Sequence, residues 1–229
     1  MKLNRLRIHR YATVDSTMTV AAALELGAIV VADEQTAGLG RHGHVWHSEP
    51  GSGLYVSAVL QPAPLLTLAL GLAAQSAISE TAGIVCDLRW PNDLMLGDRK
   101  TGGILVQLTD GKAVAGIGIN VNHASFPPDL APLATSLRLH AGREFSREEI
   151  LTALLGAIET FAEERAENIL RLFAHASSYA SGRRVTVTLP EGILEGTTAG
   201  LTADGFLRVR RDNGTDTLVI AGGVRAAGS

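Results

Sequence analysis

Cysteine is almost absent from this sequence of 229 residues, since Cys86 is the only one. A single thiol excludes an intramolecular disulfide and a structural zinc site made of several cysteines. We therefore expect a reducing, cytoplasmic setting. Lysine is also scarce, because seventeen of the twenty basic residues are arginine. Lys2 lies at a terminus and Lys112 in an Asp-Gly-Lys turn, so Lys100 stands out as a position where a compact ammonium group is needed.

Long apolar runs and a strong charge of either sign are missing as well. The most apolar stretch, Leu65 to Ala74, is too short to cross a bilayer, and the N-terminus is too polar for a signal peptide. A net charge of −3 gives no electrostatic footprint for nucleic acid or for an anionic membrane. We expect a protein that binds neither DNA nor membrane.

The elements alternate without a regular strand-helix repeat. Asp15, Ser16 and Thr17 can each cap a helix, which we expect to run for about nine residues and to end at Gly27. A mostly apolar helix is predicted over 65–82, and Ser146 with Glu149 forms a capping box that opens a long amphipathic helix with AEERAEN on its exposed side. Expected strands are 29–32, 53–60, 84–90, 94–96, 101–108 and 113–121.

Several of these strands follow one another directly, which favours a mixed or antiparallel sheet and an α+β fold. From Arg183 onward the sequence consists of short strands broken by turns such as Asp204-Gly205 and Asn213-Gly214. This pattern predicts a small all-β domain of about fifty residues, and we expect it to be a barrel. We expect one domain over 1–181 and a second over 182–229.

The stretch TAGLGRHGHVW contains a literal G-x-G-x-x-G in Gly38, Gly40 and Gly43. A dinucleotide-binding fingerprint also requires a helix after the glycines and an acidic residue about twenty positions further on. The following HVWHSEPGSG cannot open a helix, and no Asp or Glu occurs between Glu49 and Glu80. The dinucleotide interpretation therefore fails.

An ordinary surface loop remains one interpretation of these glycines, and a loop that grips an anion is the other. Backbone amides freed by glycine, together with the guanidinium of Arg41, suit a phosphate. We expect no metal ligands among His42, His44 and His47, because zinc would need a further carboxylate or a distant histidine and the sequence does not show which. Imidazoles that are solvated or face a phosphate are the simpler interpretation.

Two later clusters carry further polar residues. RWPNDL at 89–94 is a turn by composition, yet it places an arginine, a tryptophan and an aspartate at the end of a buried strand. The hairpin then returns through DRKTGGIL, so Lys100 is expected to come near Asp93. GIGINVN at 116–122 is a strand that contains Asn120, which is either a satisfied core residue or a ligand for a heterocycle.

Five motifs in this order, DST, Q-T-A-G-x-G-R-x-G-x-x-W, W-P-N-D-L, D-R-K-x-G-G-I-L and G-I-G-I-N-V-N, resemble the biotin–[acetyl-CoA-carboxylase] ligase family. The resemblance covers about residues 8–140 by motifs, and the last fifty residues resemble the family's SH3-like domain in texture only. It implies a mixed sheet flanked by helices, related to class II aminoacyl-tRNA synthetases. It further implies that biotin and Mg-ATP react to biotinyl-5′-adenylate, and that biotin then passes to a lysine of a carboxylase's biotin carboxyl carrier domain.

The resemblance also assigns roles to residues. Arg41, Asp93 and Lys100 are the implied catalytic residues. The implied biotin-binding residues are Ser16, Thr17, Gln35, Gly38, Leu39, Gly40, Lys100 and Gly103. The implied residues for ATP and the adenylate are Arg41, His42, Gly43, His44, Trp46, Arg89, Asn92 and Asn120. ATP, biotin and Mg²⁺ are the implied small molecules, and the glycine loop is expected to cover the adenylate and exclude water.

Four residues depart from the family pattern: Met18 replaces an asparagine, Leu39 and His44 replace arginines, and Arg89 replaces a lysine. Two alternatives therefore stay open, a relative that binds biotin or its adenylate without transfer, and a lipoate or octanoate ligase of the same superfamily. Only fourteen residues precede Asp15, too few for a DNA-binding helix-turn-helix, so no repressor function is expected. The sequence leaves open whether the protein is a monomer or a homodimer.

Overall fold

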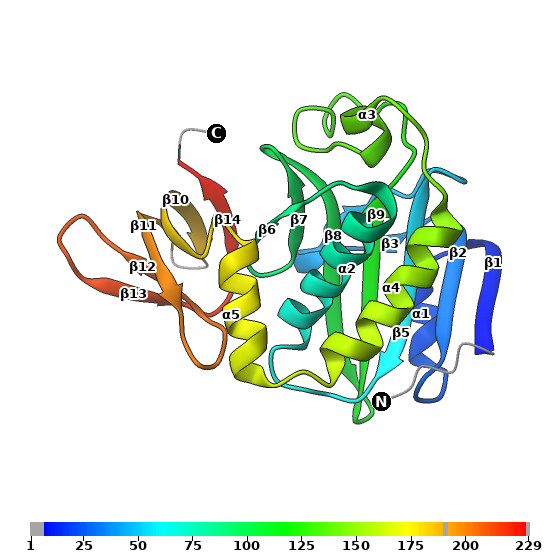
Figure 1. The fold of residues 1–229 in the computed structure, drawn as a ribbon, viewed down its shortest axis with the longest axis horizontal. Helices are drawn as coiled ribbons and strands as arrows, with labels where there is room; N and C mark the ends of the chain where they lie inside the picture. Colours follow the sequence, from blue (N-terminus) through cyan, green and yellow to red (C-terminus); the bar gives the residue numbers. More distant parts are fainter. Residues whose placement is uncertain (1–6, 190–191, 228–229) are drawn as a thin grey trace.

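The computed structural model describes residues 7–189 and 192–227. A seven-stranded mixed sheet forms its centre, in the order β1-β2-β5-β9-β8-β7-β6 (Figure 1). β1 and β2 are parallel and the other neighbours are antiparallel. The strands are β1 Ile8–Val14, β2 Ile29–Gln35, β5 Gly53–Leu60, β6 Asp87–Arg89, β7 Asp93–Leu96, β8 Arg99–Thr109 and β9 Lys112–Asn120.

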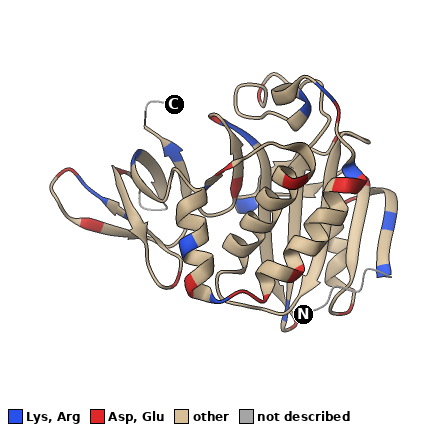
Figure 2. Ribbon diagram, in the orientation of Figure 1, with Lys and Arg blue, Asp and Glu red and all other residues tan. Residues whose placement is uncertain are grey.

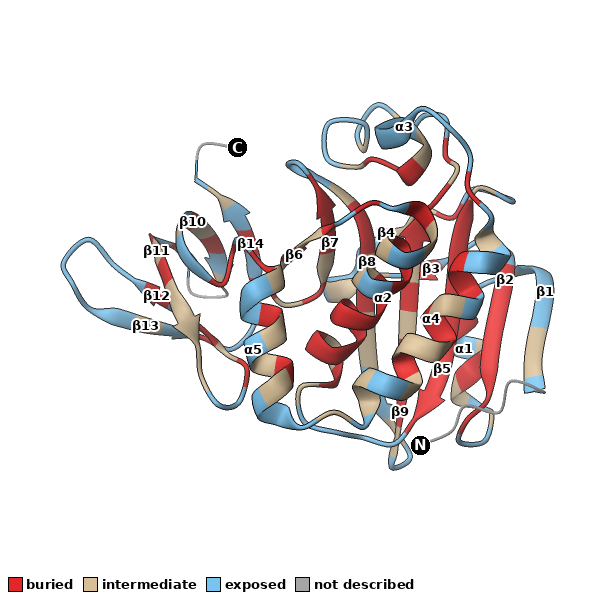
Figure 3. Cartoon of the chain, in the orientation of Figure 1, coloured by how far each residue is buried: buried red, intermediate tan, exposed pale blue. Residues whose placement is uncertain are grey.

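Helices cover both faces of this sheet, because its central strands are apolar on both sides. Ile29 and Val31 of β2 belong to the main core, whereas Val30 between them belongs to a second cluster on the opposite face. The main core includes buried residues of three helices, α2 (Leu66–Ala82), α4 (Arg147–Ala162) and α5 (Ala166–Ala176). The second cluster takes the short α1 (Thr17–Ala22), and α3 (Leu137–Ala141) lies beyond the end of β9. Figure 3 shows the buried residues concentrated on the central strands and on α2.

A second, antiparallel sheet follows in the order β13-β12-β11-β10-β14. Its strands are β10 Ser181–Leu189, β11 Gly192–Leu201, β12 Leu207–Arg210, β13 Asp216–Val219 and β14 Gly223–Ala226. The all-β texture after Arg183 is thus confirmed, but the expected barrel is open, because no pairing joins β13 to β14 among the described residues. Residues of this sheet join the main core, and the indole Nε1 of Trp90 donates to the carbonyl of Gly205 at 2.8 Å.

Several expected elements differ in length. The first helix has six residues rather than nine, and its C-cap is Ala23 rather than a residue near Gly27, because the Gly27 amide bonds the carbonyl of Val59 on β5 instead. The strand expected over 84–90 is shortened to Asp87–Arg89, since β7, its partner among the described strands, is itself four residues long.

The C-terminal helical region also differs. The long helix ends at Ala162, so AEERAEN is the break before α5 and not an exposed helix face. Neither α5 nor β1 was expected. Pro190 and Glu191, like Lys2, lie outside the described residues.

Charged residues of both signs are interspersed along the ribbon, and the central strand β5 carries none (Figure 2). Within residues 7–189 and 192–227, no helix combines the length and the apolar character needed to cross a bilayer.

Candidate active site

A pocket opens between α1, the glycine loop and the middle of the large sheet. The space between its walls amounts to about 440 Å³, part of which is continuous with the solvent at the mouth. Residues from six separate stretches of the chain line it. They are Ser16, Thr17, Met18, Gln35, Leu39, Gly40, Arg41, Trp46, Tyr55, Val56, Asn92, Lys100, Gly103, Ile104, Leu105, Gly116, Ile117 and Gly118.

The α1 side of the pocket carries uncharged polar groups joined in a network. The hydroxyl of Thr17 donates to Oε1 of Gln35 at 3.0 Å, and its backbone amide reaches the same oxygen at 2.8 Å. The buried hydroxyl of Ser57 donates to Oγ1 of Thr17 at 2.8 Å, and the amide of Gln35 donates to Ser48 at 2.9 Å. Each side chain is thus held in one orientation before any ligand arrives. We call Thr17, Gln35, Ser48 and Ser57 the hydroxyl–amide network.

A charged cluster lies on β6, β7 and β8. Nζ of Lys100 lies 2.5 Å from Oδ1 of Asp93, and Arg89 bonds Oδ2 of Asp93 at 2.7 Å. Burial disfavours the charged carboxylate, but the two cations outweigh this and hold the pKa of Asp93 below its usual value. The expected approach of Lys100 to Asp93 is confirmed. The ammonium group also lies 5.2 Å from the centre of the Trp46 ring.

Arg41 projects from the glycine loop into the same pocket. The loop folds as a small hairpin of β3 (Gly38–Leu39) and β4 (Val45–Trp46) around a single 3-10 turn, Arg41–Gly43. One guanidinium nitrogen donates to Oδ1 of Asn92 at 2.7 Å and to the carbonyl of Gly222 at 3.4 Å. Burial lowers the pKa of Arg41, and among the described residues no carboxylate lies within ion-pair distance of it. Its charge is therefore available to an anion.

The indole ring of Trp46 forms one wall of the pocket and packs against β8 and β9. A Cβ atom at Gly118 would lie 2.6 Å from the indole ring, and one at Gly103 would lie 3.2 Å from it. A side chain at Gly118 would collide with the indole, and one at Gly103 would crowd it. The indole Nε1 is buried and lacks a hydrogen-bond partner within the described part of the chain, so it can donate to a bound ligand.

Most residues implied to bind biotin line this pocket, as do Arg41, Trp46 and Asn92 from the nucleotide set. Asp93 and Arg89 lie behind Lys100, and the buried Gly38 packs against the carbonyl of Trp46. His42, Gly43 and His44 are exposed on the loop. The amide of Asn120 donates to the carbonyl of Thr135 at 3.0 Å, so Asn120 is a satisfied buried residue away from the pocket lining.

Sequence reasoning did not identify Tyr55, Val56, Leu105, Gly116 and Gly118 as lining residues. They lie on expected strands, and the pairing of β5 with β9 and of β9 with β8 brings these three strands together at the pocket. Met18, a departure from the family pattern, is buried, and a Cβ at Gly116 would lie 2.6 Å from its sulfur. Met18 thus packs against Gly116 in the floor of the pocket.

A second group of polar residues, the His47–Glu49–His123 cluster, lies next to the pocket. One candidate ligand atom from each residue lies within 4.8 Å of the other two. His123 is fully buried, and burial and the neighbouring His47 lower its pKa to about 4. Its Nε2 lies 3.2 Å from the hydroxyl oxygen of Tyr55.

Comparisons with known proteins agree with this architecture. Residues 11–123 match the model of the Biotin/lipoate A/B protein ligase family, and residues 180–224 match that of the Biotin protein ligase C terminal domain. A biotin--[acetyl-CoA-carboxylase] ligase of Paracoccus denitrificans is 32% identical over 64% of this chain and 69% of its own length. The chain belongs to the biotin protein ligase family.

Further members of the biotin protein ligase family extend the likeness to nearly the whole chain. The structure of a biotin protein ligase from Aquifex aeolicus in complex with biotin and ATP has a TM-score of 0.88 and 30% identity, over 96% of this chain and 99% of that one. The bifunctional ligase/repressor BirA of Bacillus subtilis is 33% identical over 82% of this chain. This chain spans 63% of the length of that BirA protein.

Proposed function

We propose that this chain activates biotin with ATP to biotinyl-5′-adenylate and transfers the biotinyl group to a lysine of a biotin carboxyl carrier domain. In the first step, a carboxylate oxygen of biotin attacks the α-phosphorus of ATP and pyrophosphate leaves. In the second, the neutral amine of the carrier lysine attacks the carbonyl carbon of the biotinyl-adenylate, an amide bond forms, AMP leaves and the proton of the amine passes to solvent. Mg²⁺ enters with ATP as the counter-ion of its phosphates, and we assign it no protein ligand.

One observation carries this proposal: a single pocket holds an uncharged hydroxyl–amide network and two cations. The network suits the neutral ureido ring of biotin, whose carbonyl and two N–H groups need both donors and acceptors. Lys100 and Arg41 suit the carboxylate and the phosphate, which repel each other unless positive charge lies where they meet. The membership in the biotin protein ligase family supports the same assignment.

The charged cluster fits both steps. Asp93 accepts from Lys100 and Arg89 at once, and the low pKa keeps it a carboxylate. It thereby holds the Lys100 ammonium at the pocket wall, and its negative charge can assist the approach of an incoming lysine. Arg41 lies on the hairpin over the pocket, so it can contact the adenylate from its formation until the transfer. In this position it can also keep water away from the adenylate.

The test mixes the purified chain with biotin, Mg-ATP and a carrier domain, and reads the intact mass of the carrier. One added biotinyl group that needs both ATP and biotin, and that is lost when the acceptor lysine is replaced by arginine, supports the proposal. Biotin binding without any mass change would identify a non-transferring relative instead. Modification by lipoate or octanoate alone would identify the other alternative, which no relative named above favours.

A further inference from the structure

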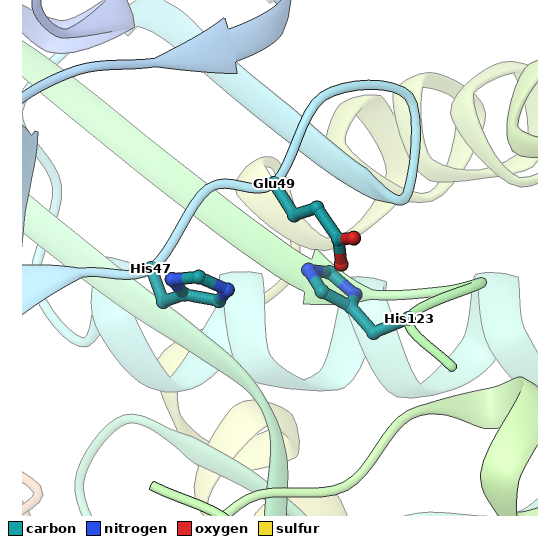
Figure 4. A group of neighbouring side chains, drawn as sticks. All are labelled: His47, Glu49 and His123. Atoms are coloured by element: carbon teal, nitrogen blue, oxygen red, sulfur yellow. The ribbon is translucent and has the colours of Figure 1, made fainter. Parts of the chain in front are cut away.

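His47, Glu49 and His123 come from two distant stretches of the chain. His47 and Glu49 follow β4, between the glycine loop and β5, while His123 follows the end of β9. Figure 4 shows the two imidazole rings and the carboxylate turned toward one another. The three candidate ligand atoms lie within 4.8 Å of one another. A tetrahedral zinc ion holds its ligand atoms roughly 3.4 Å apart, a distance that the exposed Glu49 and the half-buried His47 can reach by small side-chain rotations.

The buried member of this cluster is held in place but is not satisfied. The His123 ring stacks on Phe126, with the ring centres 5.0 Å apart and an angle of 15° between the planes. The Tyr55 hydroxyl, which donates to the Glu49 carbonyl at 3.0 Å, is the partner of Nε2. Nδ1 is buried without a partner among the residues that the structure describes. Within the described structure, Nε2 therefore has a hydrogen-bond partner and Nδ1 has none, so the ring can form one further bond.

We propose that His47, Glu49 and His123 form a zinc-binding site that ties the segment after the glycine loop to the end of β9. Two imidazoles and one carboxylate are the donor set of many zinc sites, with the fourth tetrahedral position left to water. Imidazole nitrogen favours zinc over the harder Mg²⁺ and Ca²⁺, which prefer oxygen ligands only. The site goes beyond the proposed function, since zinc binding requires neither biotin nor ATP.

The position of the site gives it a mechanical consequence. His47 directly follows Trp46, whose ring packs over Gly118 of β9. His123 lies three residues after Asn120, the last residue of β9. A zinc ion shared by His47 and His123 therefore joins the base of the glycine loop to the strand that carries the Trp46 contact. Bound zinc is expected to restrict the backbone of residues 47–52.

The first measurement is a titration of metal-free protein with ZnCl₂ by isothermal calorimetry, in the absence of biotin and ATP. We expect saturation at one zinc ion per chain and no saturable binding of Mg²⁺ or Ca²⁺ at this site. His47→Gln and Glu49→Gln are expected to weaken zinc binding by at least tenfold, as the loss of one ligand does. The exposed His175→Gln on α5 is the matched control and should bind zinc like the unchanged protein.

Two further variants separate this site from other histidines. The double variant His42→Gln/His44→Gln should keep its zinc affinity, and its loss of zinc binding would place the ion in the glycine loop and overturn the proposal. His123→Asn, with its fold checked by circular dichroism, should lose zinc binding. If that variant does not fold, the His47 and Glu49 variants carry the test, because both side chains reach solvent.

Hydrogen exchange supplies the readout for the tie between the two segments. Zinc is expected to slow exchange in residues 47–52 of the unchanged protein and to leave it unaltered in His47→Gln. No saturable zinc binding to the unchanged protein, or equal affinity in the His47 and Glu49 variants, would overturn the proposal. Neither result bears on biotin transfer, so this proposal and the proposed function can fail separately.

Discussion

The two sides of the pocket solve different problems of recognition. On the α1 side, the hydroxyl–amide network satisfies its members without a ligand, and its hydroxyls are buried. On the side of β8 and the glycine loop, Lys100 shares one carboxylate with Arg89, and Arg41 has only neutral partners. The first side is rigid and neutral, which suits selection of a heterocycle. The second holds more positive than negative charge, which suits a reaction between two anions.

The largest effect is expected on the charged side, from Lys100→Ala. Loss of one fixed cation near the developing charge should lower the rate of adenylate formation by about 100-fold or more. Pyrophosphate release under saturating biotin and ATP measures this rate. Lys112→Ala is the control, because that ammonium donates to the carbonyl of Leu24 at 3.0 Å and does not line the pocket. A change under about threefold for Lys100→Ala would remove Lys100 from the proposed mechanism.

Arg41→Gly tests whether the glycine loop, on the charged side of the pocket, retains the adenylate. Removal of the guanidinium frees the adenylate without disturbing the core, so its escape should rise roughly tenfold, which corresponds to about 1.4 kcal/mol. Free adenylate modifies any lysine, and we expect biotin on bystander proteins such as added serum albumin. A western blot with streptavidin measures this labelling. Modification confined to the carrier domain would show that Arg41 does not retain the adenylate.

On the neutral side, Thr17→Val removes a hydroxyl of nearly the same shape. It leaves the buried Ser57 hydroxyl without its acceptor and deprives Gln35 of one donor. Such losses cost about 1–3 kcal/mol, so the KM for biotin should rise about tenfold or more with little change in the KM for ATP. Thr13→Val on β1, whose hydroxyl bonds the side chain of Glu34 near solvent, is the control. An equal rise in both KM values would contradict a role confined to biotin.

The smallest expected effect is a pH dependence of stability that arises from Asp93. Its folded-state pKa is lowered by Lys100 and Arg89, so below about pH 4 the unfolded chain binds more protons than the folded one. The stabilisation is present above the unfolded-state pKa and is lost as the pH falls through the folded-state pKa. Urea unfolding measures the free energy of unfolding between about pH 2 and pH 6. Its slope against pH should be shallower for Asp93→Asn than for the unchanged protein. An unchanged slope would mean that other carboxylates determine the acid sensitivity.

The sequence could predict those parts of the site that depend on local turns. The Gly97-Asp98 turn joins β7 to β8, so the approach of Lys100 to Asp93 follows from the chain itself. The exclusion of a dinucleotide fold also followed from the residues after Gly43. Pairings between distant strands could not be predicted. The register of β5 against β9 places Tyr55 opposite Gly118, and this register decides which residues of the two strands face the pocket.

Long-range contacts also explain the other differences. The edge strand β1 depends on parallel pairing with β2, and parallel partners leave no turn signal in the sequence. The separate helix α5 begins at Ala166 without a capping side chain, so no local residue marks it. The approach of His123 to His47 and Glu49 is another contact between distant segments, and for this reason the three histidines of the loop region gave no complete ligand set.

The bond from Arg41 to the carbonyl of Gly222 joins the glycine loop to the C-terminal sheet, which is also attached through Trp90 and Gly205. This bond therefore couples the position of the glycine loop to the attachment of that sheet. By thermodynamic reciprocity, a ligand that favours the closed loop favours the attached sheet by the same factor, and a partner that holds the sheet in place tightens the loop on its ligand. If the proposed function holds, a carrier domain that touches only the C-terminal sheet is therefore expected to alter the affinity for the adenylate from a distance.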